Sequence, residues 1–261
     1  GKHTPQRQKY PHKKANDMKK YGLIGKHISY SFSEKYFSEK FAREGISDCS
    51  YRIFDIQDIE NVKDVLADSD ICGLNVTIPY KVEIMSLLDE ISDEARQIGA
   101  VNTVKVSPDG HLSGYNSDVY GFRQALAPFL ESRHQRALIL GTGGASKAVA
   151  YVLNGLGIDY FFVSREKRGE SRFLTYSELT QAHVKSCPLI VNTTPLGTFP
   201  RTDTCPDIPY GALGPDNLLF DLVYNPQETL FMKKGRENGA SVSNGLTMLA
   251  LQAEKSWELW Q

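Results

Sequence analysis

Three glycines are the residues of this sequence best suited to holding a phosphate-bearing ligand. Gly141, Gly143 and Gly144 follow an apolar run at 137–140, and an amphipathic helical pattern begins at Ala145. Bare backbone at a helix N-terminus can receive a pyrophosphate through N–H groups that have no partner within the helix. The order strand, glycine turn, helix, second strand is typical of dinucleotide-binding units, although glycine also serves tight turns that bind nothing. We therefore expect a dinucleotide site here.

The residues after the second strand indicate which dinucleotide. An NAD site places an acidic residue at this strand end, where it accepts a hydrogen bond from the ribose 2′-hydroxyl. This chain has Ser164 there, followed by Arg165, Lys167 and Arg168. Guanidinium groups suit a 2′-phosphate, so the pattern favours NADP over NAD. The alternative is a solvated basic turn with no ligand.

Two further polar groups lie in the first hundred residues. Ser31 and Ser33 stand two apart just before a predicted helix, where paired hydroxyls can hold a small carboxylate. Ser33 can equally serve as the helix N-cap, with Glu34 in the first turn. Lys81 follows a strand-to-helix turn at the expected carboxyl edge of a sheet, where α/β proteins bind ligands, but a lysine is more often a solvated surface residue.

Asn102 and Asp118 are the last two candidate functional residues that residue type and position alone indicate. Asn102 lies in a predicted strand with apolar neighbours, and a buried asparagine must find partners in the backbone or in a ligand. Asp118 begins a predicted helix, where it can act on a ligand or simply serve as the N-cap.

The first part of the chain shows alternating strand and helix patterns, and these elements must position the candidate residues. The sequence Pro108-Asp109-Gly110 predicts a hairpin, so the sheet should be mixed. Thr77-Ile78-Pro79 is expected to open a helix, with helical stretches running to about residue 98. The strands expected here are 21–24, 51–56, 71–76, 100–106 and 111–115, and the other helices are 33–44 and 59–66.

The remainder of the chain reads as a second α/β unit with parallel strands. The predicted strands are 137–140, 160–163, 189–191, 218–223 and 240–243, and the predicted helices are 118–130, 145–157, 227–238 and 244–261. No low-complexity linker separates the two parts, so we expect two domains close together with a cleft between them.

Composition and charge argue against several classes of protein. The 261 residues carry a net charge of −1, which argues against a general nucleic-acid binder, and no apolar run is long enough to cross a membrane. Four cysteines without close pairing, and no metal-ligand spacing, fit a reducing, cytoplasmic setting. Residues 1–17 are rich in basic side chains and precede Met18, so we expect an appended segment, an over-extended gene start or a basic tail.

Together these motifs resemble the shikimate dehydrogenase family over nearly the whole chain from Tyr21. The resemblance implies an α/β protein of two domains. A mixed-sheet substrate domain would occupy 18–117, and a doubly wound Rossmann-type NADP domain would occupy 118–243. The C-terminal helix, 244–261, would return to the substrate domain.

The resemblance also implies roles for individual residues. Lys81 and Asp118 would be the catalytic pair. The expected substrate contacts are Ser31, Ser33, Thr77, Asn102, Tyr224 and Gln252. The expected cofactor contacts are Gly141, Gly143, Gly144, Ala145, Ser164, Arg165, Arg168, Asn192, Thr193 and Gly245.

The implied activity is reversible hydride transfer between NADPH and the ring carbonyl of 3-dehydroshikimate, giving shikimate in the chorismate pathway. Lys81, paired with Asp118, would supply the proton that the developing negative charge requires. The expected partner is this small-molecule substrate, with no nucleic acid and no membrane, and the protein is expected to be a monomer or homodimer.

Departures from the family pattern leave alternatives open. Glu34 stands where proline is common, Val119 where glycine is common, and Ser164 where many members have asparagine, and the expected second arginine lies further along than Arg168. A quinate/shikimate dehydrogenase that uses NAD is the close alternative. A dehydrogenase of the methylene-tetrahydrofolate type and a non-catalytic nucleotide-binding regulator are the others.

Overall fold

The computed structural model describes residues 18–29 and 31–261. The chain forms two compact units, one made of residues through Asn116 together with Ser256–Gln261, and one made of Ser117–Lys255. The basic segment 1–17, expected to be an appended or over-extended start, lies outside the described residues. Within the described ranges, no helix has the length and apolar character that a bilayer span requires.

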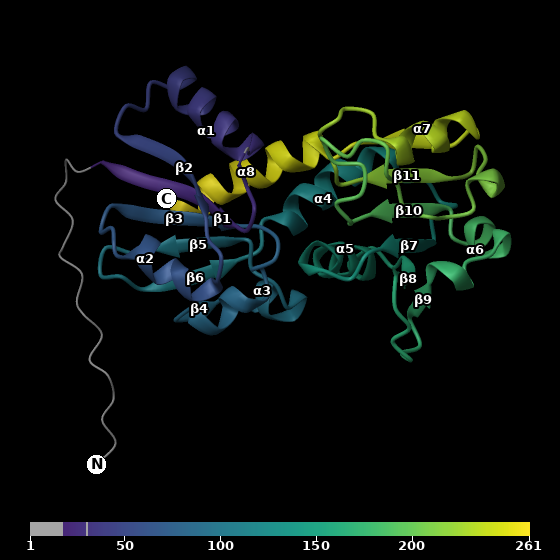
Figure 1. The fold of residues 1–261 in the computed structure, drawn as a ribbon, viewed down its shortest axis with the longest axis horizontal. Coiled ribbons are helices and arrows are strands. Elements are labelled where there is room, and N and C mark those ends of the chain that lie inside the picture. The colour runs from purple at the N-terminus through teal and green to yellow at the C-terminus, as the bar shows by residue number, and fades with distance from the viewer. Residues whose placement is uncertain (1–17, 30) are drawn as a thin grey trace, which may run out of the picture. The chain divides into compact units, whose positions relative to one another are not determined.

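The first unit is built on a mixed six-stranded sheet (Figure 1). The strands, in spatial order, are β2 (Cys49–Asp55), β1 (Lys19–Gly25), β3 (Ile71–Val76), β5 (Thr103–Val106), β6 (Leu112–Tyr115) and β4 (Glu90–Ile91). β1 pairs in parallel with β2 and β3, whereas β5 is antiparallel to β3 and β6. β5 and β6 form the hairpin predicted from Pro108-Asp109-Gly110, so the expectation of a mixed sheet is confirmed.

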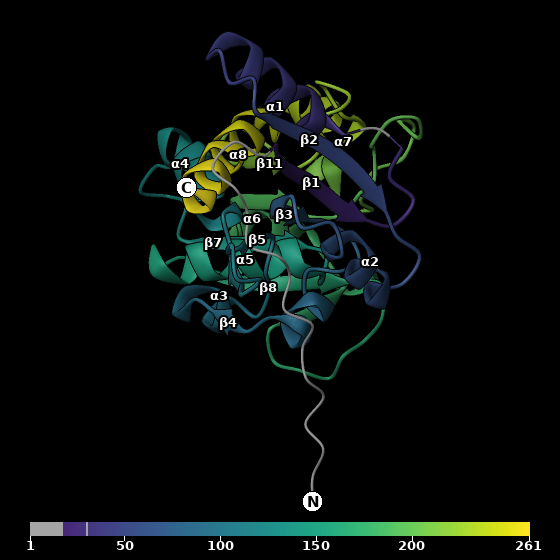
Figure 2. The same ribbon diagram turned by 90° about the vertical axis from the view of Figure 1, so that its left-hand side faces the viewer.

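Aromatic side chains join one face of this sheet to α1 (Phe32–Arg43) and to the end of α8 (Leu246–Trp260), both visible in Figure 2. Tyr21 of β1 stacks on Trp260 with ring centres 4.8 Å apart, and Phe37 of α1 stacks on Tyr51 of β2 at 4.6 Å. The Trp260 indole N–H donates to the carbonyl of Val104 at 3.0 Å. The last turns of the C-terminal helix are therefore part of the first unit.

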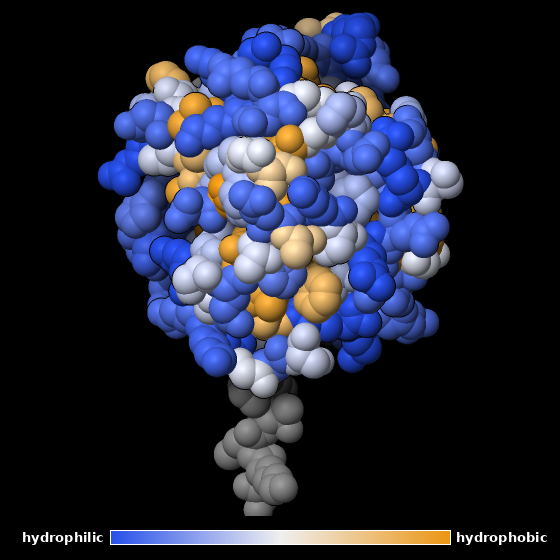
Figure 3. Space-filling view, turned by 90° about the vertical axis from the view of Figure 1, so that its right-hand side faces the viewer, coloured by the Kyte–Doolittle hydropathy of each residue, from blue (hydrophilic) through white to orange (hydrophobic). Residues whose placement is uncertain are grey.

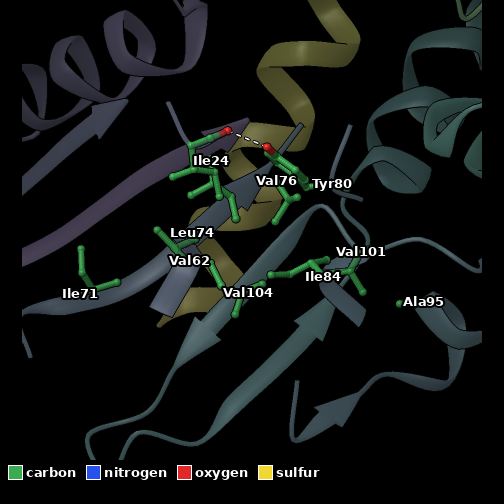
Figure 4. Close-up of a cluster of buried hydrophobic side chains, with 11 residues drawn as sticks. Ile24, Val62, Ile71, Leu74, Val76, Tyr80, Ile84, Ala95, Val101 and Val104 are labelled. Atoms are coloured by element: carbon green, nitrogen blue, oxygen red, sulfur yellow. Dashed lines mark hydrogen bonds between the residues drawn. The ribbon is translucent and has the colours of Figure 1, made fainter. Parts of the chain in front are cut away.

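Aliphatic side chains cover the other face (Figure 4). Ile24, Leu74 and Val104 from the sheet pack against Val62 and Ile84. Tyr80 enters the same cluster and donates its hydroxyl to the carbonyl of Ile56 at 2.6 Å. The elements on this side are the 3-10 helices η1 (Ile59–Asn61) and η2 (Glu83–Leu87) and the α-helices α2 (Val62–Leu66) and α3 (Asp93–Ile98).

The prediction of a helix opening at Thr77-Ile78-Pro79 is wrong. Only the 3-10 helix η2 forms in this stretch before β4, and α3 begins anew at Asp93. The backbone N–H groups of Asp89 and Ser92 donate to Leu112 and Gly114 of β6, at 3.0 and 2.9 Å. Pairing with a neighbouring strand thus replaces the helical bonds that the spacing of apolar residues suggested.

The second unit has six parallel strands in the doubly wound order. They are β12 (Ser241–Ser243), β11 (Leu218–Asp221), β10 (Leu189–Asn192), β7 (Arg136–Leu140), β8 (Asp159–Ser164) and β9 (Phe173–Thr175). The chain runs from β7 outward to β9 and then returns to β10 on the other side of β7. The strand order therefore reverses between β7 and β10, which is where open α/β sheets bind ligands.

Several helices accompany this sheet, and Figure 3 shows the side of the molecule that carries α6 and α7, where apolar residues lie scattered among hydrophilic ones. The α-helices are α4 (Asp118–Leu126), α5 (Gly144–Gly155), α6 (Gln181–Ser186), α7 (Leu230–Glu237) and most of α8. Short 3-10 helices are η3 (Ala127–Phe129), η4 (Tyr176–Glu178) and η5 (Tyr210–Ala212). β9 and α6 had no counterpart in the sequence-based prediction.

Candidate active site

The glycine turn begins where β7 ends, beside the end of β10. Gly141 has φ +108°, in the region that favours glycine, and a Cβ there would lie 2.6 Å from the Oγ1 of Thr193. Thr193 donates to the carbonyl of Leu140 twice, from its N–H at 2.9 Å and from its hydroxyl at 2.6 Å. The predicted glycine turn and the predicted Thr193 therefore meet at the point where strand order reverses.

The N-terminus of α5 has the properties that a pyrophosphate requires. Gly143 is the N-cap and has no side chain to accept from the first-turn N–H groups, and the helix begins at Gly144 and Ala145. A Cβ on Gly143 would meet nothing within 4 Å, so a ligand can approach the backbone there. Ser146 turns its hydroxyl inward, donating to the carbonyl of Gly143 at 2.6 Å. The turn thus fits the phosphate-binding role expected of it.

A cation from the basic segment reaches this turn. The Arg168 guanidinium donates to the hydroxyl of Thr142 at 3.0 Å and lies 5.4 Å from the ring centre of Phe173. Ser164 stabilises a local turn in this segment, since its hydroxyl donates to the Glu166 carbonyl at 2.8 Å and accepts from the Glu166 N–H at 3.1 Å. Arginine is well suited to binding phosphate, so the position of Arg168 beside the glycine turn is compatible with the expected 2′-phosphate contact.

Arg165 lies close to Tyr176. Burial raises the pKa of Tyr176 to about 12, and the positive charge of Arg165 acts in the opposite direction. Arg165 and Arg168 therefore both project from the loop that follows β8, as the sequence predicted.

Asn192 holds the loop after β10 through both ends of its amide. It is fully buried; its Nδ2 donates to Asp221 at 3.0 Å, and its Oδ1 accepts from the N–H and hydroxyl of Thr194 at 3.0 and 2.7 Å. Asp221, at the end of β11, also accepts from the Val223 N–H and the Thr229 hydroxyl. Burial raises the pKa of Asp221 to about 6. The sequence analysis did not identify this carboxylate, which holds the loop in place through Asn192.

The other residues expected from the second unit lie around α8. Tyr224 follows β11, and the N–H of Gly245, just before α8, donates to the carbonyl of Val223 at 3.1 Å. Gln252 is buried in α8 and accepts from the hydroxyl of Ser117 at 3.3 Å. This bond fixes the Gln252 amide against the start of α4.

The two residues expected to be catalytic belong to different units. Asp118 is buried and is the first residue of α4, whose N-cap is Ser117, so the reading of Asp118 as an N-cap is wrong. Lys81 follows the end of β3, and its carbonyl accepts from the N–H of Val101 at 2.8 Å.

Ser31 and Ser33 are both buried at the start of α1. Ser31 is the N-cap, and its hydroxyl oxygen accepts from the N–H of Ser33 at 3.0 Å, so the alternative that made Ser33 the N-cap is wrong. Thr77 directly follows β3 and donates its N–H to the carbonyl of Ile24 at 2.9 Å. The serine pair after β1 and Thr77 after the neighbouring β3 therefore lie at the same carboxyl edge of the sheet.

Asn102 is buried, as predicted, but a partner of its side chain is another side chain and not the backbone or a ligand that the sequence led us to expect. Only 3% of it is exposed, and its Oδ1 accepts from the hydroxyl of Thr103 at 3.0 Å. Thr103 belongs to a group of buried polar residues that the sequence analysis did not single out, together with Tyr51, Asn75 and Ser256. Asn75 carried the same signal as Asn102, since it stands between the apolar Leu74 and Val76.

Comparisons with known proteins agree with this geometry. A family model described as the shikimate dehydrogenase substrate binding domain matches residues 23–104. The NADP(+)-dependent shikimate dehydrogenase of Clostridium beijerinckii is 40% identical over 256 residues, covering 94% of this chain and 92% of that protein.

Solved structures give the same result. The crystal structure of shikimate dehydrogenase 1 from Peptoclostridium difficile has a TM-score of 0.83 at 36% identity, covering 94% of this chain and 92% of that one. Quinate dehydrogenase from Corynebacterium glutamicum in complex with NAD has a TM-score of 0.81 at 27% identity, with 94% of both chains covered. Since a relative at 40% identity matches more than nine tenths of the sequence, this chain belongs to the shikimate dehydrogenase family.

Proposed function

We propose that this chain is an NADP-dependent shikimate dehydrogenase. It catalyses the reversible reduction of 3-dehydroshikimate to shikimate with NADPH, a step of chorismate and aromatic amino acid biosynthesis. The observation that carries the proposal is the likeness to an NADP(+)-dependent shikimate dehydrogenase along nearly the whole chain. The geometry of the glycine turn supports the same function.

The second unit holds the cofactor in this proposal. The backbone of Gly141, Gly143, Gly144 and Ala145 receives the pyrophosphate at the start of α5. Arg165 and Arg168 receive the 2′-phosphate, and Ser164 keeps their loop closed. Asn192 and Thr193 shape the loop after β10, and Gly245 leads into α8, near the nicotinamide end.

The first unit takes the substrate. The domain boundaries that we propose are 18–117 for the substrate domain, 118–243 for the cofactor domain and 244–261 for the helix that returns to the first. The match of a substrate-binding-domain model to residues 23–104 supports this assignment. Bonds from the end of α8 to the first sheet, such as that of Trp260 to Val104, support the return of the helix.

Hydroxyl and amide groups recognise the substrate. Ser31 and Ser33 hold its carboxylate, since short hydroxyl side chains at a helix N-terminus favour an anion. The ring is held by Thr77, Asn102, Tyr224 and Gln252. These contacts fix which face of the ring is presented for reaction.

Proton transfer falls to Lys81. NADPH, when bound, supplies the hydride that reduces the ring carbonyl. Negative charge then grows on the carbonyl oxygen, and the Lys81 ammonium donates a proton to it. The Asp118 carboxylate keeps the lysine charged and oriented. In the reverse direction Lys81 accepts the proton of the reacting hydroxyl.

An assay of four substrate and cofactor combinations tests the proposal. Shikimate and quinate are each offered to the purified protein with NADP and with NAD, and reduced cofactor is followed by absorbance. We expect the pair of shikimate and NADP to give the highest kcat/KM. No turnover with shikimate under either cofactor would refute the proposal.

A second candidate is an NAD-dependent quinate/shikimate dehydrogenase. The likeness to the quinate dehydrogenase of Corynebacterium glutamicum favours it. Fastest turnover in the combination of quinate and NAD would establish this candidate in place of the first.

Compartment and assembly complete the proposal. All four cysteines are free thiols, which suits the reducing cytoplasm. We propose that the protein acts there on its small-molecule substrate as a monomer or homodimer. Light scattering on the purified protein measures its mass and decides between the two.

A further inference from the structure

A continuous chain of buried hydrogen bonds runs through the first unit between two of the proposed substrate contacts. At one end the Ser33 side chain is hydrogen-bonded to the hydroxyl of Tyr51. Tyr51 donates to the Oδ1 of Asn75 at 2.8 Å, and the Nδ2 of Asn75 donates to the hydroxyl oxygen of Ser256 at 2.9 Å. We call the four residues Tyr51, Asn75, Ser256 and Thr103 the polar relay.

The relay ends on Asn102. Ser256 and Thr103 bring their hydroxyl oxygens within 2.9 Å of each other, and Thr103 donates to the Oδ1 of Asn102 at 3.0 Å. A hydroxyl has only one hydrogen to donate. The hydrogen of Thr103 is directed to Asn102, and its oxygen lies beside the hydroxyl of Ser256. The relay therefore connects Tyr51 to Asn102 through buried polar groups.

The bond from Thr103 fixes the amide of Asn102. Its oxygen accepts from Thr103, so its NH₂ group is directed away from the relay and is a donor. The orientation of an asparagine amide decides whether its NH₂ group or its oxygen faces a ligand. The relay therefore sets whether Asn102 donates a hydrogen bond to the ligand or accepts one, which the position of Asn102 alone does not determine.

The other end of the relay holds Ser33. Burial raises the pKa of Tyr51 well above its ordinary value, and the Ser33 hydrogen bond acts against that rise, so Tyr51 stays a neutral phenol. Because Tyr51 gives its own hydrogen to Asn75, its oxygen receives that of Ser33. A carboxylate bound at Ser33 would draw this hydrogen to itself, while the bond to Asn75 keeps the phenol in place.

Burial makes each link of the relay expensive to break. Tyr51, Asn75, Thr103 and Ser256 are each at most 5% exposed. A buried polar group that loses its partner retains the full cost of its desolvation. The relay therefore favours a single arrangement of its hydrogen bonds and transmits it from β2 through β3 and α8 to β5.

We propose that the polar relay positions Ser33 and Asn102 for substrate recognition, which makes Tyr51, Asn75, Thr103 and Ser256 specificity-determining residues that act through others. The inference rests on the proposed function, because Ser33 and Asn102 are its substrate contacts. It goes beyond it by assigning a role to four residues that touch no substrate in that proposal, including one supplied by the C-terminal helix.

Two nearly isosteric substitutions test the relay. Tyr51→Phe removes the link to Ser33, and Thr103→Val removes the donor to Asn102. We expect the KM for shikimate to rise about tenfold in each, as for the loss of one buried hydrogen bond, with the KM for NADP unchanged. Thr103→Ser keeps the hydroxyl and should restore most of the affinity for shikimate.

Tyr21→Phe is the matched control. Tyr21 is equally buried on the neighbouring strand of the same sheet, but its hydroxyl is bonded to Gln261 and not to the relay. This variant should keep the shikimate KM of the unaltered protein. It thereby measures what the loss of any buried tyrosine hydroxyl does to the first unit.

The outcomes separate the relay from the proposed function. If the unaltered protein oxidises shikimate, yet Tyr51→Phe and Thr103→Val keep its KM values, the relay has no positioning role. Equal changes in the KM for shikimate and for NADP would also overturn the inference, because they would indicate a general loss of structure. Absence of shikimate turnover in the unaltered protein would overturn the proposed function and this inference with it.

Discussion

The candidate functional residues of the two units are of different kinds. In the second unit the central feature is backbone: a glycine turn at the reversal of strand order, with a helix N-terminus behind it. In the first unit the expected contacts are side chains, and buried hydrogen bonds from other side chains hold two of them.

This difference has a consequence for substitution. A site made of backbone is harmed by adding atoms, whereas a site made of positioned side chains is harmed by removing them. A dinucleotide presents repeated phosphates that N–H groups can bind, but a small hydroxylated acid must be distinguished group by group. We therefore expect changes in the first unit to affect the substrate and changes in the second to affect the cofactor.

The largest effect should come from Lys81→Met. This change keeps much of the bulk of the side chain but removes the proton donor that we propose, so turnover should fall roughly 10²–10⁴-fold. NADPH binding, followed by fluorescence, should stay near normal because Lys81 belongs to the first unit.

Asp118, the partner that we propose for Lys81, offers a second test of the same step. Asp118→Asn should also slow turnover, and the double variant should cost less than the product of the single ones, because in the proposed mechanism the two groups act as a unit. A Lys81→Met protein that is merely less heat-stable, with turnover per folded molecule intact, would show that the lysine is structural.

Replacing both Arg165 and Arg168 with alanine should act on the cofactor alone. Each lost charge-assisted hydrogen bond costs about 1.5–3 kcal/mol, so with both arginines replaced NADPH should bind roughly a hundredfold or more weakly, while NADH binding changes little. Arg172→Ala is the matched control, since Arg172 also follows β8 but pairs with Asp159 at 2.7 Å. Equal weakening of both cofactors would rule out a 2′-phosphate contact.

The buried Asp221 predicts a pH dependence of stability that belongs to the second unit. Its pKa is raised from 3.8 to about 6 by burial, so it stabilises the fold fully below about pH 4 and that contribution is lost as pH rises through 6. The loss is up to about 3 kcal/mol, at 1.36 kcal/mol for each pKa unit.

Asp221→Asn removes this titration. Urea unfolding at pH 4.5 and pH 7 gives the change in unfolding free energy for each protein, and the unaltered protein should lose more stability than the variant over that interval. The same pH-induced change in both proteins would show that the carboxyl of Asp221 titrates in its ordinary range.

The smallest effect should come from Gly143→Ala. The added methyl meets no protein atom within 4 Å, so folding should be unaffected, but it occupies the space beside the backbone that we assign to the pyrophosphate. NADPH should bind about tenfold more weakly, or about 1.4 kcal/mol. Gly155→Ala, later in the same helix and equally uncrowded, should bind NADPH normally; identical affinities in the two variants would place the phosphates elsewhere.

The second unit could be predicted closely because its signals are local. Buried strands such as β7 read as unbroken apolar runs, and the glycines at 141, 143 and 144 mark the turn by residue type alone. The first unit was harder to predict where tertiary pairing decided the structure. Residues 77–92 carry helical spacing, but only the 3-10 helix η2 forms there, and residues 89–92 pair with β6.

The candidate site divides in the same way. Residues with a motif of their own, such as Ser31, Lys81 and Asn102, could be named from the sequence. The members of the polar relay come from β2, β3, β5 and α8, so only the folded chain shows that they touch. Asp221 could not be identified from the sequence, because nothing distinguishes a buried aspartate from the many exposed ones.

The division of labour between the units is tested most directly by measuring kcat/KM for shikimate and quinate, each with NADP and NAD, in the protein that carries both Arg165→Ala and Arg168→Ala. We expect the preference for NADP over NAD to collapse while the preference for shikimate over quinate keeps its original value. A change of both preferences together, or a retained preference for NADP, would contradict the assignment of cofactor recognition to the second unit and substrate recognition to the first.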